Sequence, residues 1–138
     1  MKKYLKNASL VLLPALFIFS SCNKENNNTG GTNSRVVKYE ITGNFTGKLT
    51  VIYNDNVNGN IVINNVALPF LKDTTYPANI TGIGIGGQAS IPGVAGQTAT
   101  MKIYSGGNVV KTVSATAGSL GELVLPAVAY NFKSIAVM

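Results

Sequence analysis

Apolar and polar side chains alternate along several short stretches of this chain, which is the pattern of half-buried β-strands. In the stretch 35–43, Val37, Tyr39 and Ile41 would share one face, with charged side chains on the other. Similar stretches follow at 48–54, 98–105, 108–114, 120–125 and, shorter and more mixed, at 131–138. No stretch after residue 34 repeats with the period of a helix, and turn residues recur about every 8–12 positions. The sequence therefore predicts an all-β domain over residues 35–138, folded as a sandwich or a barrel.

An Asn-Gly pair at 58–59 predicts a tight turn between two strands. It favours a type I′ hairpin, since both central residues of that turn take positive φ. A two-residue turn there would place Val51 opposite Val66 and Leu49 opposite Leu68, on one apolar face. The same segment also echoes the start of a calcium-binding loop, but its ligand positions offer no carboxylate. We therefore interpret it as a hairpin.

A Gly-Gly pair at 106–107 predicts a second two-residue turn. Its register would place Tyr104 opposite Val109 and Lys102 opposite Lys111. Directly opposed like charges are destabilising, so these lysines would need solvent, a bulge or an anionic partner. The four residues form our candidate face for a partner protein or an anionic ligand. The alternative is a pair of hydrated lysines on an ordinary sheet surface.

A glycine-rich stretch at 82–87 places Gly82, Gly84 and Gly86 on one strand face and two isoleucines on the other. The isoleucines would enter the core and leave a strip of bare backbone outside. Such strips mark the close approach of another backbone or an aromatic ring, either within the fold or from a partner. A phosphate loop would need a following helix, which the sequence does not predict. The three glycines are therefore a candidate docking strip.

Residues 1–21 have the features of a secretory signal peptide. Three lysines precede an apolar run at 8–19, which is too short to span a bilayer core that needs ~20 residues. The residues that follow resemble the lipobox of bacterial lipoproteins, in which Cys22 would be acylated and tether the chain to membrane lipid. Asn23 stands where Asp is associated with inner-membrane retention, so we expect the outer membrane, facing the periplasm or the cell surface. Residues 22–34 would then form a polar, flexible linker.

Composition excludes several classes of function. Cleavage of the signal removes three of the eleven basic residues and leaves eight basic and five acidic side chains. This small excess of positive charge does not indicate a nucleic-acid-binding protein. The chain has no His and a single Cys, so zinc, copper and haem sites of the usual kinds lack ligands and no metal or cofactor is expected. Serines have no histidine base, and the carboxylates are widely spaced. We therefore predict no catalytic residues and a protein that is not an enzyme.

Four segments together resemble one known family, in order and spacing. The opening strand at 37–43, the aromatic-bearing strand at 51–53, the Leu-Pro-Phe at 68–70 and the glycine hairpin at 101–110 resemble the mycobacterial membrane protein small (MmpS) family. The resemblance implies an immunoglobulin-like β-sandwich outside the cytoplasmic membrane. It also implies an accessory role beside exporters of lipids or siderophores. Members of that family are typically held by a transmembrane helix, whereas this sequence predicts a lipid anchor.

Taken together, we expect a β-sandwich of seven or eight mostly antiparallel strands that acts by binding. Its expected partners are membrane lipid, through Cys22, and a membrane transporter or another envelope protein. The alternative is a surface glycan-binding or adhesive, structural module. A platform of exposed tyrosines would favour glycan binding, and an apolar groove beside the glycine strip would favour a protein partner. A flat, unpaired edge strand would favour a structural role.

Overall fold

A computed structural model describes residues 34–133. Three predicted features lie outside the described residues: the signal peptide, the lipidation site at Cys22 and the linker up to residue 33. The last predicted stretch, beyond residue 133, lies outside them as well. The described part of the chain contains no helix of the length and apolarity needed to cross a membrane.

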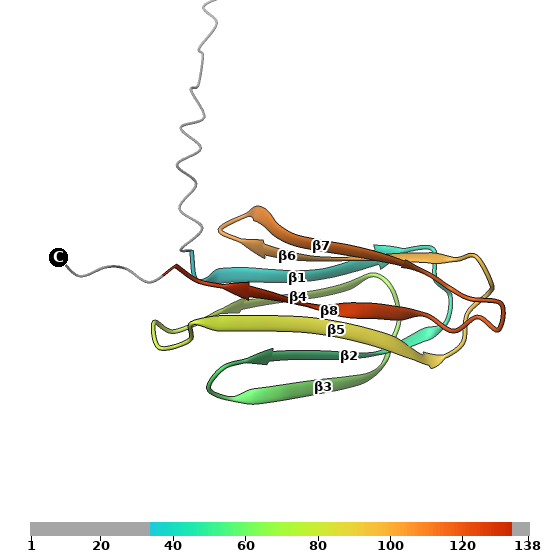
Figure 1. Cartoon of the computed structure of the whole chain (residues 1–138), viewed down its shortest axis with the longest axis horizontal. Coiled ribbons are helices and arrows are strands. Elements are labelled where there is room, and N and C mark those ends of the chain that lie inside the picture. The colour runs from blue at the N-terminus through green and yellow to red at the C-terminus, as the bar shows by residue number, and fades with distance from the viewer. Residues whose placement is uncertain (1–33, 134–138) are drawn as a thin grey trace, which may run out of the picture.

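The described residues form eight antiparallel strands in two four-stranded sheets (Figure 1). The strands are β1 (Val36–Gly43), β2 (Lys48–Asp55), β3 (Gly59–Val66), β4 (Phe70–Thr75), β5 (Gly82–Ile91), β6 (Thr98–Ser105), β7 (Asn108–Thr116) and β8 (Val124–Asn131). Sheet A has the order β4-β1-β6-β7, and sheet B has the order β3-β2-β5-β8. Within residues 34–133 only β2–β3 and β6–β7 are hairpins, and every other connection crosses from one sheet to the other. The prediction of an all-β sandwich of seven or eight strands is confirmed.

The core lies between the two sheets, where every second residue of each inner strand points inward. In β1 the predicted apolar face, Val37, Tyr39 and Ile41, is fully buried. Full burial of one such side chain stabilises the fold by about 1.5–3 kcal/mol. The other inner strands contribute Leu49, Val51, Ile83, Ile85, Met101 and Ile103, and the edge strand β8 adds Leu125.

The predicted strand at 120–125 is wrong for most of its length, because the chain there forms a compact loop. The backbone N–H of Gly118 donates to the carbonyl oxygen of Glu122 over 2.8 Å, and Gly121 has a φ of 76°. The Glu122 carboxylate also accepts from the backbone N–H of Leu120 over 2.9 Å. These local hydrogen bonds replace a sheet ladder, so β8 begins only at Val124.

The predicted two-residue turn at 58–59 is also wrong. The loop has three residues, and Asp55 pairs with Gly59 across the hairpin. Only Gly59 takes a positive φ, of 77°, while Asn58 does not. As a result Val51 lies opposite Ile63, not Val66. The other predicted pair also fails, since a register shift along β2 brings Leu49 opposite Val66, not Leu68.

The chain enters the domain at Arg35, and this residue ties three segments together. Its guanidinium donates to the carbonyl oxygens of Pro77, over 3.1 Å, and Ile80. It also lies over the ring of Phe132, 4.4 Å from the ring centroid. The start of β1, the loop between β4 and β5, and the residue after β8 therefore meet at one end of the sandwich (Figure 1).

Candidate functional site

The glycine strip lies on the outer face of β5, as the sequence predicts. Ile83 and Ile85 are buried in the core, 3% and 2% exposed. Gly82, Gly84 and Gly86 alternate with them and face away from the core. Since β5 lies between β2 and β8, its backbone hydrogen bonds are already used within the sheet. A partner can therefore pack against the strip but cannot add a strand to β5.

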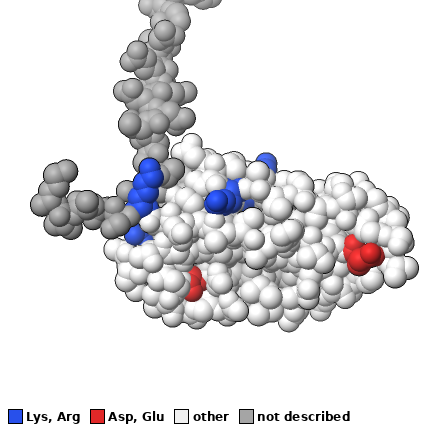
Figure 2. All heavy atoms as spheres, viewed as in Figure 1, with Lys and Arg blue, Asp and Glu red and all other residues white. Residues whose placement is uncertain are grey.

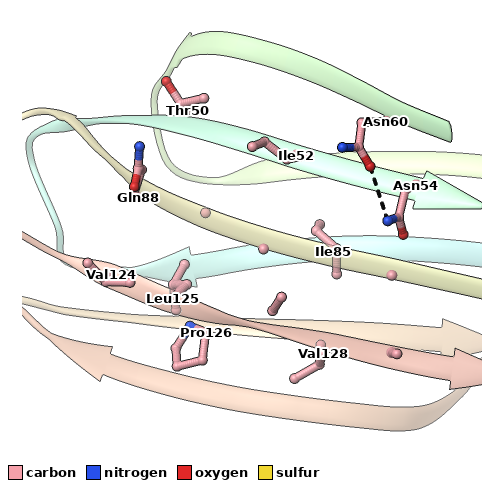
Figure 3. Close-up of a pocket in the computed structure, with 15 residues that line it drawn as sticks. Thr50, Ile52, Asn54, Asn60, Ile85, Gln88, Val124, Leu125, Pro126 and Val128 are labelled. Atoms are coloured by element: carbon pink, nitrogen blue, oxygen red, sulfur yellow. Dashed lines mark hydrogen bonds between the residues drawn. The ribbon is translucent and has the colours of Figure 1, made fainter.

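A groove of about 480 Å³ runs over Gly84 and Gly86 of this strip, but Gly82 does not line it. Its floor is the backbone of β5 at Gly84, Gly86 and Gly87, and Ile52 of β2 and Val124 of β8 rise on either side (Figure 3). The remaining lining residues are Thr50, Asn54, Asn60, Ile85, Gln88, Leu125, Pro126, Ala127, Val128 and Ala129. An apolar groove therefore stands beside the predicted docking strip.

None of the residues that line the groove is charged. Figure 2 shows the charged atoms gathered in a few small spots, while the surface over β2, β3, β5 and β8 is largely free of them. The polar groups of the lining are amides and a hydroxyl. Asn54 donates from Nδ2 to Oδ1 of Asn60 over 3.2 Å. The side-chain amide of the exposed Gln88 makes no hydrogen bond within residues 34–133. The groove therefore suits an uncharged occupant.

Close packing within the sheet disfavours a side chain at one of the glycines. A Cβ at Gly86 would lie 3.2 Å from both Cα and Cβ of Ala127 on β8, which is tighter than ordinary packing. At Gly84 the nearest atom would be Oδ1 of Asn54, at 2.7 Å, the end of a side chain that can move. A side chain at Gly86 would therefore press on β8, whereas one at Gly84 would have to displace the Asn54 amide.

The predicted pairing of Lys102 with Lys111 is wrong. Tyr104 does lie opposite Val109, and Gly106 and Gly107 both take positive φ, as a type I′ turn requires. One step farther from the turn, however, the register shifts between Ile103 and Tyr104. This bulge moves the pairing by one residue, so Lys102 lies opposite Thr112 and Lys111 opposite Ile103.

A carboxylate that sequence reasoning missed stands at the centre of this face. Glu40 of β1 accepts from the Tyr104 hydroxyl at Oε1, over 2.9 Å, and from Lys38 at Oε2, over 3.3 Å. The Lys38 ammonium also lies 4.1 Å from the centroid of the Tyr104 ring. The Tyr104 hydrogen bond, Lys38 and the nearby Lys102 hold the pKa of Glu40 below its ordinary value.

This cluster changes the chemistry of the predicted face. Lys38 and Glu40 were visible in the sequence as the outer face of β1, but only the pairing of β1 with β6 brings them beside Lys102 and Tyr104. The Glu40 carboxylate already binds the Tyr104 hydroxyl and the Lys38 ammonium group. The face is therefore mixed in charge, and the groove on sheet B is the better candidate site.

Aromatic side chains in residues 34–133 do not form an exposed platform. Tyr39, Tyr53, Tyr76 and Tyr130 are each at most 8% exposed. The hydroxyls of Tyr39 and Tyr76 lie 2.8 Å apart in a hydrogen bond, and burial raises the pKa of Tyr39 far above its ordinary value. Tyr104 is half-buried against Lys38. The described residues also contain no cluster of His, Cys, Asp or Glu that could hold a metal ion.

Comparison with known proteins identifies no relative that would assign a site. No family model matches the sequence. The curated proteins likewise contain no significant match. The resemblance to the MmpS family therefore stays a prediction, and the groove is argued from its geometry.

Proposed function

We propose that this protein is a lipid-anchored, non-enzymatic binding module of the bacterial envelope. Cys22 would carry the lipid anchor in the outer membrane, and the sandwich would contact a membrane exporter or another envelope protein. The observation that carries the proposal is the uncharged, apolar groove beside the glycine strip of β5. A neutral segment of a partner fits there without bringing a charge out of water.

The occupant proposed for the groove is an uncharged segment of a protein. Ile52 and Val124 are 38% and 62% exposed, which leaves apolar area to bury on both sides of the floor. The glycine floor lets a protruding partner side chain approach the backbone of β5. The rim amide of Gln88 can fix the orientation of a partner by hydrogen bonding.

Site-specific photocrosslinking in intact cells tests this function. A benzophenone amino acid replaces Val124 at the groove, and in a matched control it replaces Leu71, which is 58% exposed on β4 of sheet A. We expect a discrete adduct with one membrane protein from the groove position and none from the control. The variant Ile52→Glu, which puts a charge on the groove wall, should abolish that adduct, whereas Leu71→Glu should leave it unchanged.

Equal labelling from Val124 and Leu71, or an adduct that survives Ile52→Glu, would contradict the groove as the binding surface. Mass spectrometry of the adduct then separates an exporter subunit from any other envelope protein. A structural role, in which copies of the chain assemble, is the second candidate function. The specific observation in its favour is that β3 is an edge strand without a charged residue or a proline.

A further inference from the structure

Two sheets of four strands leave four edge strands, and three of them are protected against pairing with another chain. Exposed edges template strand addition unless charge, proline or a bulge prevents it. β4 carries Lys72, which lies opposite the buried Tyr39 and so sits on the inner face. β7 has a bulge and Lys111. β8 has Pro126 and a register shift, and it also packs beside β7.

The fourth edge, β3, lacks these protections over its first five residues. Its sequence contains no charged residue and no proline. The register with β2 is regular from Gly59 to Ile63, and the irregularity comes only after it, where Asn65 takes a φ of 57°. Ile61 and Val62 are 44% and 52% exposed, one on each face of the sheet. β3 therefore presents an edge of regular register that carries no charge and has apolar residues at its centre.

The sequence of this edge reads the same in both directions: residues 60–64 are Asn-Ile-Val-Ile-Asn. Two copies of a strand that pair antiparallel about a two-fold axis bring residue i opposite residue j, with i + j constant. With the axis at Val62, valine meets valine, Ile61 meets Ile63, and Asn60 meets Asn64. Like side chains thus meet at every position.

We propose that β3 is a self-association edge, on which the β3 of a second copy of this chain pairs antiparallel about a two-fold axis at Val62. The absence of charge matters here, because identical strands would otherwise oppose like charges. The isoleucine pairs would lie on the inner face, next to the buried Tyr53, and cover Ile61, which is exposed in a single copy, and Ile63, which is half-buried. The axis residue Val62 does not line the groove, although Asn60 lines it and also lies in the proposed dimer seam.

Asparagine side chains at both ends of the palindrome are already oriented by β2. Oδ1 of Asn60 accepts from Asn54, and Oδ1 of Asn64 accepts from the Thr50 hydroxyl over 3.0 Å. Each amide nitrogen remains able to donate to the opposing asparagine of the second copy. The regular stretch is short, so we expect a reversible dimer, whose population rises with concentration, and not a permanent one.

Disulfide trapping in the full-length protein tests the register. At the proposed axis residue 62 meets its own counterpart, so Val62→Cys should form a covalent dimer under mild oxidation with copper-phenanthroline. Asn60→Cys should form much less, because residue 60 meets residue 64. Leu71→Cys, on the protected edge β4, is the matched control and should stay monomeric, since Leu71 is 58% exposed and Val62 is 52% exposed. The parent chain, with Cys22 alone, should give no covalent dimer.

Equal trapping at residues 60, 62 and 71, or no trapping at any of them, would overturn the proposal. A second measurement needs no cysteine. Val62→Lys places two ammonium groups at the axis, and in sedimentation of the detergent-solubilised protein it should shift the monomer–dimer midpoint at least tenfold toward monomer. Leu71→Lys should not move the midpoint. A Val62→Lys midpoint equal to that of the parent chain would also sink the proposal.

Discussion

Asp55 shows how one side chain decides the shape of a hairpin. Its Oδ1 accepts from the backbone N–H groups of Val57, over 2.8 Å, and Asn58, over 2.6 Å. Its Oδ2 accepts from the side chain of Asn58 over 2.9 Å. The carboxylate thus closes the three-residue loop from inside, and Gly59 supplies the one positive φ that the chain needs to return.

This arrangement makes the stability of the hairpin depend on pH. Hydrogen bonds from the backbone of Asn58, then from its side chain, lower the pKa of Asp55. The stabilisation is therefore present above the ordinary pKa of aspartate and is lost as pH falls through the lowered value. Asp55→Asn keeps an oxygen acceptor but no charge, so its unfolding free energy should change less between pH 6 and pH 3 than that of the parent chain. Asp55→Ala should lose about 2 kcal/mol at pH 7.

Denaturant titrations at several pH values measure both effects. An unchanged pH dependence in Asp55→Asn would contradict this account of the carboxylate. The sequence did not reveal the loop, because Asn-Gly is a strong signal for a two-residue turn. The competing signal was the aspartate four residues before the glycine, which favours a type I turn followed by a left-handed Gly.

Among the elements, the β6–β7 hairpin is the one whose turn could be predicted. Gly106 and Gly107 have φ values of 57° and 83°, a region that costs other residues about 1–2 kcal/mol. Nothing lies within 4 Å of a Cβ added at Gly107, so its replacement tests backbone conformation alone.

We expect Gly107→Ala to lower the free energy of unfolding by about 1 kcal/mol. Gly107→Asn should cost less, since asparagine tolerates left-handed φ better than alanine does. Thermal or urea unfolding of both variants gives the comparison. An alanine variant as stable as the asparagine variant would show that the turn is not of the type described.

The register beyond that turn could not be predicted, because a bulge adds one residue and leaves no mark in the local sequence. The edge strands β4 and β8 were also hard to predict from the sequence. β4 is short, and β8 carries Pro126 in a stretch where apolar and polar residues do not alternate. Glu40 meets Lys102 only through pairing between distant segments. The alternation in β1 and in the first half of β5 could be predicted, because one face of each stretch is buried.

At the scale of the whole molecule, the sequence indicated the class of fold but not the order of the strands. The order β4-β1-β6-β7 depends on five crossings between the sheets, and long-range pairing of this kind has no local signal. The groove was anticipated only in part. The glycine strip of β5 could be predicted from the sequence. The walls of the groove could not, because they come from β2 and β8, the two strands on either side of β5.

The anchor is tested on the full chain in bacteria. Cys22→Ala should release the protein from membranes into the soluble envelope fraction, because no thiol remains to be acylated. The matched variant Asn23→Asp should stay membrane-bound but move toward the inner membrane. Fractionation followed by immunoblotting measures both. Membrane association that persists in Cys22→Ala would contradict the anchor.

The position of β1 has a mechanical consequence. Force applied to the chain ahead of Arg35 enters the domain through β1, which is hydrogen-bonded to β4 on one side and to β6 on the other. A pull along the strand axis loads both ladders in shear, so many hydrogen bonds must break together. Peeling a terminal edge strand would instead break them one at a time. A tether at this end would therefore pull on a strand that resists being drawn out of its sheet.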